Sequence, residues 1–227
     1  MSKKHLKSLA APKTWNIKRK NNVFTTRPNP GRSLELSMPI NLILRDMLGY
    51  AHNTKEVKKI LNSEKVSVNG RIVKDFKFPV GIMDCIEIPE LKQIFLFYIG
   101  PKGRFIIQSV KDKVETYKII GKTLLKNKKL QLNCLGGKNV FVDKDSYKLG
   151  DSIILDKNKI KKHLKFEEGA CIYLYGGKYI GCTGILESIR DVHNKHFIII
   201  KIKNEKIETL KDYAFVIENK VIGDKNE

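Results

Sequence analysis

The chain has 227 residues, and its 44 Lys and Arg against 24 Asp and Glu give a formal net charge of +20, which predicts a polyanionic partner. The longest apolar run, Ile94–Ile99, is far shorter than the roughly 18 residues of a membrane-spanning helix, and the start lacks the apolar core of a secretory signal. Four widely spaced cysteines match neither a disulfide framework nor paired zinc ligands, so we expect reduced thiols in a cytoplasmic protein that does not bind a membrane.

The positive charge is distributed unevenly along the chain. Residues 1–36 hold nine basic and one acidic residue, 37–90 hold eight and seven, 91–164 hold seventeen and six, and 165–227 hold ten of each. Together with the turn signals, this predicts an N-terminal arm (1–36), three small domains (37–90, 91–164 and 165–222) and a tail (223–227). The attraction for a polyanion should be concentrated in the arm and the middle domain.

The N-terminal segment has no carboxylate before Glu35 and cannot form a core by itself. It is either a disordered tail or an arm that becomes ordered on RNA, with Trp15 packed on a domain or stacked on a base. In the free protein we expect it to be mobile, or only partly docked through Leu6, Leu9 and Trp15. Its predicted phosphate contacts are Lys13, Lys18, Arg19 and Lys20.

Residues 37–90 contain two amphipathic helices followed by a tight hairpin. Apolar residues recur with helical spacing over 39–48, and a second helix begins at Asn53, with Glu56 completing a capping arrangement. Alternating residues on either side of Asn69-Gly70 predict a hairpin with a type I′ turn. The cations of this domain that we expect to contact RNA are Arg45, Lys55, Lys58, Lys59, Arg71, Lys74 and Lys77.

From residue 91 onward the pattern changes to short strands. Segments 94–99 and 104–110 flank a glycine turn whose tip presents Lys102 and Arg104, both predicted to contact RNA. Further strands are predicted at 118–120, 129–133, 139–142 and 151–155. Several short strands at such intervals favour a small barrel or sandwich.

The last domain is rich in glycine, at positions 169, 176, 177, 181 and 184. Glycines permit the positive φ angles and close backbone approach that short loops between bent strands require. The pattern resembles the KOW motif of small five-stranded barrels, in which Lys178 and Tyr179 at the loop tip supply a charge and a stacking face. Because this domain has no net charge, we expect it to be the weaker RNA contact.

Several segments also resemble one known family. The words VSVNGRIVKD and VGIMDCIEI resemble the S4-type RNA-binding domain. With HLKSLAAPKTWNIKRK, VFTTRPNPG, GGKNVFVDKDSYKLGDSIILD and FEEGACIYLYGGKYIGCTGILESI, the chain is similar to the S4e family of archaeal and eukaryotic small-subunit ribosomal proteins over nearly all its length. The early end after the glycine-rich unit is more similar to the archaeal members.

The resemblance implies an α+β, mostly β fold. It comprises an S4-type module of two helices and a β-hairpin, a central small β-barrel-like domain and a C-terminal KOW (SH3-like) barrel. It also implies a structural constituent of the small ribosomal subunit in the cytoplasm, one that binds small-subunit ribosomal RNA through basic surfaces, supports assembly and contacts neighbouring ribosomal proteins. An obligate homo-oligomer is not expected.

No catalytic residue, cofactor or metal is predicted. Gly121-Lys-Thr123 ends like a nucleotide-binding P-loop, but Thr116 stands where that motif needs glycine. His193 and His196 lie three apart beside Asp191, a spacing that points them to opposite faces of an extended segment. Two alternatives stay open: an RNA-modification factor, which needs a catalytic domain with a buried aspartate, and a KOW-containing transcription elongation factor, which would bind polymerase.

Overall fold

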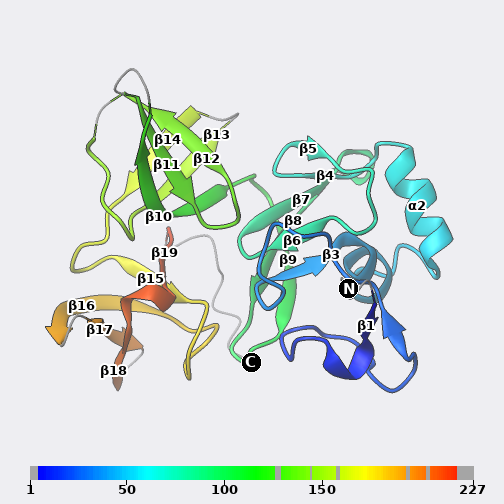
Figure 1. Cartoon of the computed structure of the whole chain (residues 1–227), viewed down its shortest axis with the longest axis horizontal. Coiled ribbons are helices and arrows are strands. Elements are labelled where there is room, and N and C mark those ends of the chain that lie inside the picture. Colours follow the sequence, from blue (N-terminus) through cyan, green and yellow to red (C-terminus); the bar gives the residue numbers. More distant parts are fainter. Residues whose placement is uncertain are drawn as a thin grey trace. The chain divides into compact units, whose positions relative to one another are not determined.

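The computed structural model describes residues 5–125, 129–143, 145–156, 159–192, 195–202 and 205–218, and is mostly β with a few short helices (Figure 1). The chain divides into two compact units, Met1–Lys113 and Val114–Glu227. In the described part, no helix is long and apolar enough to cross a membrane. The predicted tail at 223–227 and the side chain of His193 lie outside the described residues.

The first predicted helix is present, but it widens in its second half. It begins as α1 (Ile40–Leu42) and continues as the π-helical segment η2 (Ile43–Met47), in which the N–H of Leu48 donates to the carbonyl of Ile43 over 2.9 Å. Of the apolar positions that predicted the helix, Ile40, Ile43 and Leu44 are fully buried, and Met47 and Leu48 are half-buried. Burial of this face stabilises a helix that is too short to persist by propensity alone.

The second helix, α2 (Thr54–Asn62), confirms the predicted capping residues. The side chain of Asn53 accepts a hydrogen bond from the Glu56 N–H at 3.0 Å, as an N-cap should. The Glu56 carboxylate turns back to the N–H of His52 at 2.7 Å and to the Asn53 side-chain amide at 2.8 Å. The backbone hydrogen bond from His52 is the main cause that lowers the pKa of Glu56.

The predicted hairpin in the first unit is also confirmed. Strands β4 (Ser67–Val68) and β5 (Arg71–Ile72) pair antiparallel, and both turn residues have positive φ, 49° at Asn69 and 73° at Gly70. These strands belong to a five-stranded sheet of order β5-β4-β7-β8-β9. The other three strands are β7 (Asp84–Ile88), β8 (Gln93–Ile99) and β9 (Phe105–Val110). A smaller sheet joins β3 (Ser37–Pro39) to β6 (Pro79–Gly81).

The structure corrects the predicted boundary at residue 91. Strands β8 and β9 were assigned to the middle domain, but β8 pairs with β7 from Asp84↔Phe97 to Ile88↔Gln93 across the short turn η3 (Pro89–Leu91). The aromatic rings of Phe97 and Phe105 stack at 4.4 Å in the buried interior of the first unit. An apolar strand joined to the next strand by a turn of four or five residues pairs most easily with that neighbour, so the division falls after β9.

The N-terminal segment is a second correction, because residues 5–36 fold with the first unit. Strands β1 (Leu6–Lys7) and β2 (Phe24–Thr25) pair, with η1 (Ser8–Ala10) after β1. The indole of Trp15 is 2% exposed and donates to the carbonyl of Ser37 at 2.9 Å. Leu9, one of the predicted anchors, is 76% exposed. The segment lacks a core of its own, yet one large aromatic side chain lets it share that of its neighbours.

The second unit begins with a sheet of order β12-β11-β10-β13-β14. Its strands are β10 (Glu115–Leu124), β11 (Leu130–Cys134), β12 (Asn139–Val142), β13 (Ser152–Asp156) and β14 (Lys159–Leu164). Strand β10 pairs with β13 through residues 115–118 and with β11 from Ile119 onward, where the register shifts between Ile119 and Gly121. The predicted strands are present, and the lysine-rich β14 was not predicted.

The C-terminal sheet has the order β18-β17-β16-β15-β19. Its elements are β15 (Cys171–Leu174), β16 (Thr183–Val192), β17 (Lys195–Ile202), β18 (Glu205–Leu210), η5 (Lys211–Tyr213) and β19 (Ala214–Val216). Two glycines act as predicted: Gly181 has φ +83°, and a Cβ at Gly184 would lie 2.6 Å from the carbonyl oxygen of Lys201. The first permits a tight loop and the second a close approach of β16 to β17.

Candidate nucleic-acid interface

Helix α2 presents lysines on the face opposite its buried side. Val57 and Leu61 are fully buried, whereas Lys55, Lys58 and Lys59 are exposed. The ammonium of Lys58 lies 4.5 Å from the centroid of the Phe76 ring, a cation–π contact that orients it. Among the described residues, Lys55 and Lys59 form no ion pair. This face therefore offers two ammonium groups, those of Lys55 and Lys59, that no described carboxylate pairs with.

The hairpin and the turn after it hold three predicted cations in different states. The guanidinium of Arg71 lies 5.8 Å from the Phe78 ring, and the ammonium of Lys77 lies 5.6 Å from the Phe76 ring. Lys74 pairs with Glu64 at 2.6 Å, but both side chains are at least half exposed. Because an exposed pair of this kind contributes about 0–1 kcal/mol, Lys74 can exchange Glu64 for a phosphate at small cost.

Arg45, on η2, is partly neutralised by its neighbour. Its Nε lies 2.6 Å from one carboxylate oxygen of Asp46 and its Nη2 lies 2.9 Å from the other. The hydrogen bond that Arg45 donates to the Asp46 side chain raises the pKa of the already cationic guanidinium. An anion near Arg45 would meet the field of this carboxylate as well, so Arg45 is a weaker phosphate ligand than the lysines of α2.

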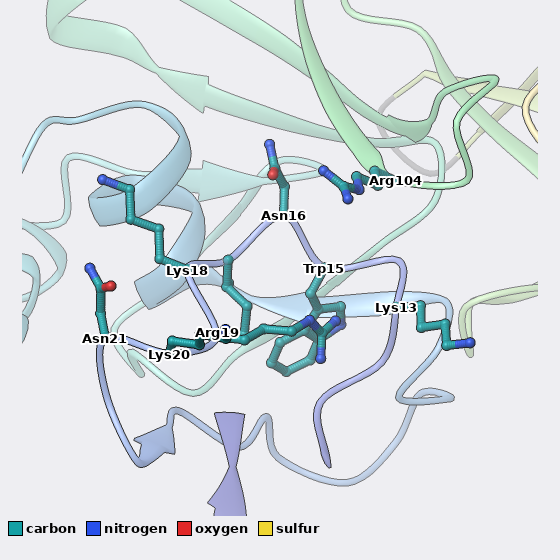
Figure 2. Close-up of a pocket in the computed structure, with 9 residues that line it drawn as sticks. Lys13, Trp15, Asn16, Lys18, Arg19, Lys20, Asn21 and Arg104 are labelled. Carbon is teal, nitrogen blue, oxygen red and sulfur yellow. The ribbon is translucent and has the colours of Figure 1, made fainter. Parts of the chain in front are cut away.

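Five of the predicted cations surround a depression of about 340 Å³ in the first unit (Figure 2). The lining residues are Lys13, Trp15, Asn16, Ile17, Lys18, Arg19, Lys20, Asn21 and Arg104. Figure 2 shows the amino groups of Lys13 and Lys18 pointing away from Trp15 in different directions. Lys13, Lys18 and Lys20 are exposed, and no carboxylate lines this depression. The arrangement suits several spaced phosphates of a nucleic-acid backbone better than one compact anion.

Arg19, one of the predicted phosphate contacts, also stabilises the fold through its guanidinium. It donates to the carbonyl oxygens of Ala11 at 2.7 Å, Pro12 at 2.5 Å and Ser8 at 3.2 Å. A planar guanidinium with five N–H groups can bind several carbonyls of one loop at once. Arg19 therefore shapes the loop that presents the neighbouring lysines, a role that was not predicted for it.

The turn between β8 and β9 presents its two cations as expected. The N–H of Gly103 donates to the carbonyl of Gly100 at 2.9 Å, and the N–H of Gly100 donates to the carbonyl of Arg104 at 2.8 Å. Both Lys102 and Arg104 are exposed. Arg104 reaches the depression of Figure 2, whereas Lys102 does not line it.

In the second unit, the loop between β15 and β16 carries Lys178. Its ammonium is exposed and lies 5.4 Å from the ring of Tyr179. The Tyr179 ring is half-buried and packs against the core of the C-terminal sheet. Lys178 thus offers a charge, while Tyr179 contributes mainly to the core and is a poorer stacking face than predicted.

Comparison with known proteins agrees with this geometry. A family model described as the RS4NT (NUC023) domain matches residues 2–31, and one described as Ribosomal family S4e matches residues 92–161. A small ribosomal subunit protein eS4 from Methanosphaera stadtmanae is 40% identical over 224 residues, which are 95% of this chain and 92% of the relative. The chain belongs to the S4e family. An eS4 protein from Methanococcus aeolicus is 38% identical over 229 residues, 95% of this chain and 94% of the relative.

The S4e fold is also found among solved structures. The crystal structure of the 30S ribosomal protein S4e from Thermoplasma acidophilum matches with a TM-score of 0.70 and 25% identity, over 80% of this chain and 95% of that one. The depression of Figure 2 draws on both family-model segments, because Lys13 to Asn21 fall in the first and Arg104 in the second. Two stretches far apart in the S4e sequence thus form one surface.

Two polar residues that line the depression of Figure 2, Asn16 and Asn21, were not predicted. Their signal in the sequence is their position at either end of a run of cations, where an amide can hydrogen bond to RNA without adding charge. For metals, no group of three or more His, Cys, Asp or Glu gathers within the described residues.

Proposed function

We propose that this S4e protein is a structural constituent of the small ribosomal subunit, where it binds ribosomal RNA and supports assembly. The observation that carries the proposal is its 40% identity, over 95% of the chain, to a protein named small ribosomal subunit protein eS4. Membership of this family favours a ribosomal role over an RNA-modification or elongation factor. The partners are then small-subunit ribosomal RNA and neighbouring ribosomal proteins in the cytoplasm.

The mechanism follows from where the cations lie. The lysines of α2, the hairpin cations and the lysines around the depression of Figure 2 are all exposed in the first unit. Each lysine that replaces a condensed counterion at a phosphate contributes entropy to binding, which makes the affinity depend steeply on salt. Folded elements hold these cations at fixed separations, so the protein selects RNA by shape more than by base sequence.

The finer division into modules is part of the same proposal. We assign the two helices and the Asn69-Gly70 hairpin to an S4-type module, the sheet of β10–β14 to a small barrel-like domain, and the sheet of β15–β19 to a KOW barrel. The capped helix, the type I′ turn and the loop around Gly181 support these assignments. In each, β-structure or packed helices provide a rigid support for exposed cations.

The proposal is tested by measuring the affinity of the full chain for small-subunit ribosomal RNA as potassium chloride is raised. The double variant K55A/K59A should fold normally, bind more weakly, and reduce the slope of log affinity against log salt by about 2. The control K201A/K206A removes two exposed lysines from the stretch 165–227, whose basic and acidic residues balance at ten of each, and should change the slope less. An affinity that hardly responds to salt in the unmodified protein would contradict the mechanism.

A further inference from the structure

A second depression, of about 270 Å³, lies elsewhere in the first unit. Five separate stretches of the chain meet there, and the residues that matter for its chemistry are Phe24, Thr26, Arg27, Arg45, Thr54 and Lys77. Three of them are cations and no carboxylate lines the depression, although Asp46 pairs with Arg45 from outside it. Arg27 and Phe24 were not among the residues predicted to bind RNA.

Two hydroxyl groups in this depression are held in place from below. The side-chain amide of Asn41, which is fully buried, donates to Thr26 Oγ1 at 2.7 Å and to Thr54 Oγ1 at 3.4 Å. Since each hydroxyl accepts from Asn41, its own hydrogen is available to donate elsewhere. Within the described residues, the Asn41 carbonyl oxygen has no hydrogen-bond partner. An unpaired buried carbonyl oxygen destabilises the fold, and the same Asn41 side chain fixes the direction of both hydroxyls.

The depression also has one aromatic ring that is open to a ligand. Phe24, on β2, is 55% exposed, with the ring of His5 5.6 Å away and tilted. The other phenylalanine that lines it, Phe76, already has the ammonium groups of Lys58 and Lys77 within 4.5 and 5.6 Å of its ring. Phe24 is therefore the ring on which a flat, apolar group can stack.

We propose that this depression binds one unstacked nucleotide of RNA. Its base stacks on Phe24, and its phosphate lies against Arg27 and Lys77 and accepts from the hydroxyls of Thr26 and Thr54. A cavity of about 270 Å³ is at the lower end of small-ligand sites, so it admits a single nucleotide and excludes a paired duplex. An aromatic ring beside cations suits a nucleotide better than an acidic peptide, which needs only the charges.

This inference rests on the proposed RNA-binding function and adds recognition of a bulged or looped-out position. The test uses the full chain and two fluorescent RNA hairpins that differ only in one unpaired uridine. The unmodified protein should bind the bulged hairpin about tenfold more tightly, the typical effect of one base stacked on an aromatic ring. F24A should bind both hairpins equally, whereas F24W should keep the preference.

V23A is the matched control, because Val23 is 70% exposed beside Phe24 but does not line the depression. It should keep the preference, and a V23A protein that loses it would overturn the assignment to Phe24. A 4-thiouridine at the bulge should crosslink to the peptide containing residues 22–27, and crosslinking only to other peptides would also overturn it. Tight, salt-dependent binding of small-subunit ribosomal RNA without any preference for the bulge would overturn this inference alone. Failure to bind that RNA would overturn the proposed function as well.

Discussion

At the scale of single residues, Lys118 is a lysine placed where water hardly reaches. It lies on β10, is 5% exposed, and its ammonium donates to the carbonyl of Asp212 at 2.7 Å, with the ring of Tyr175 5.2 Å away. Burial is the main cause that lowers its pKa from 10.5 to about 8, although the charge of Asp212 acts in the opposite direction. The carbonyl and the ring do not fully replace the lost hydration.

This burial predicts a stability that rises with pH. Below about pH 8 Lys118 is charged in the folded and the unfolded state, so the burial penalty opposes folding. Between pH 8 and 10.5 the folded state has lost the proton and the unfolded state has not, so the free energy of unfolding should rise by up to roughly 3 kcal/mol. Urea unfolding at pH 7.5 and pH 10 measures this rise in the free energy of unfolding. K118M should lack this increment, and equal pH responses of the two proteins would refute the assignment to Lys118.

Arg19 makes a second prediction at this scale, because a sequence cannot show which cation in a run turns inward. R19A should lower the free energy of unfolding by about 1–3 kcal/mol, since it removes the guanidinium that donates to the carbonyls of Ser8, Ala11 and Pro12 together. K20A, which removes an exposed neighbour, should change it by less than about 0.5 kcal/mol. Thermal or urea unfolding of the unmodified protein, R19A and K20A measures both changes. Equal stability of R19A and K20A would contradict this stabilising role of Arg19.

At the scale of elements, the hairpin turn is a point of attachment as well as a reversal of the chain. The Asn69 side chain accepts from the N–H of Cys85 at 2.7 Å and donates to the Asp84 carboxylate at 2.8 Å. Asp84, 2% exposed, also accepts from the Gly81 N–H and forms an ion pair with Arg32. The turn therefore connects β4–β5, β7 and the N-terminal segment through one buried carboxylate.

This network predicts that N69A is more damaging than G70A. G70A costs about 1–2 kcal/mol, because an alanine must adopt a positive φ of 73°. N69A has a similar backbone penalty at φ 49° and in addition removes one of the donors to Asp84 and the acceptor of the Cys85 N–H, which costs about 1–3 kcal/mol more. The control K74A should be nearly neutral, because Lys74 and its partner Glu64 are both exposed. Midpoints of urea unfolding rank the three variants, and a G70A protein less stable than N69A would contradict the network.

The elements also show which structure can be predicted from the sequence. The cap at Asn53, the helix after it and the Asn69-Gly70 turn depend on residues within a few positions of one another, so their patterns are sufficient. The docking of Trp15 beside Ser37 and the pairing of β8 with β7 depend on partners that a local sequence pattern does not identify. Strand β14 was missed because its lysine-rich sequence resembles a solvated loop. The cations that line the depression of Figure 2 were all named from the sequence, whereas Phe24 and Arg27 become a candidate site only once the fold brings them to Thr54 and Lys77.

At the scale of the whole molecule, the two units differ in charge. Residues 1–113 hold 22 Lys and Arg against 9 Asp and Glu, whereas residues 114–227 hold 22 against 15. Produced separately, both units should fold, because each has its own sheets and buried residues. Unit 1–113 should bind small-subunit ribosomal RNA with the steeper salt dependence, since it has more unbalanced cations. Circular dichroism and salt-dependent binding of the two fragments test this, and an equal or steeper slope for 114–227 would contradict it.

The N-terminal segment can complete its docking only after much of the first unit has been synthesised. Trp15 donates to the carbonyl of Ser37, and Arg32 pairs with Asp84. The carbonyl of Thr14 accepts from the N–H of Phe105 at 2.8 Å, so each contact forms only after its later partner has been synthesised. At about 5–20 residues per second, the first residues emerge several seconds before their last partner is made. During that interval a strongly basic segment is newly made and has no place to dock. The nascent chain then binds nearby RNA non-specifically most readily, and the completion of β9 ends that period.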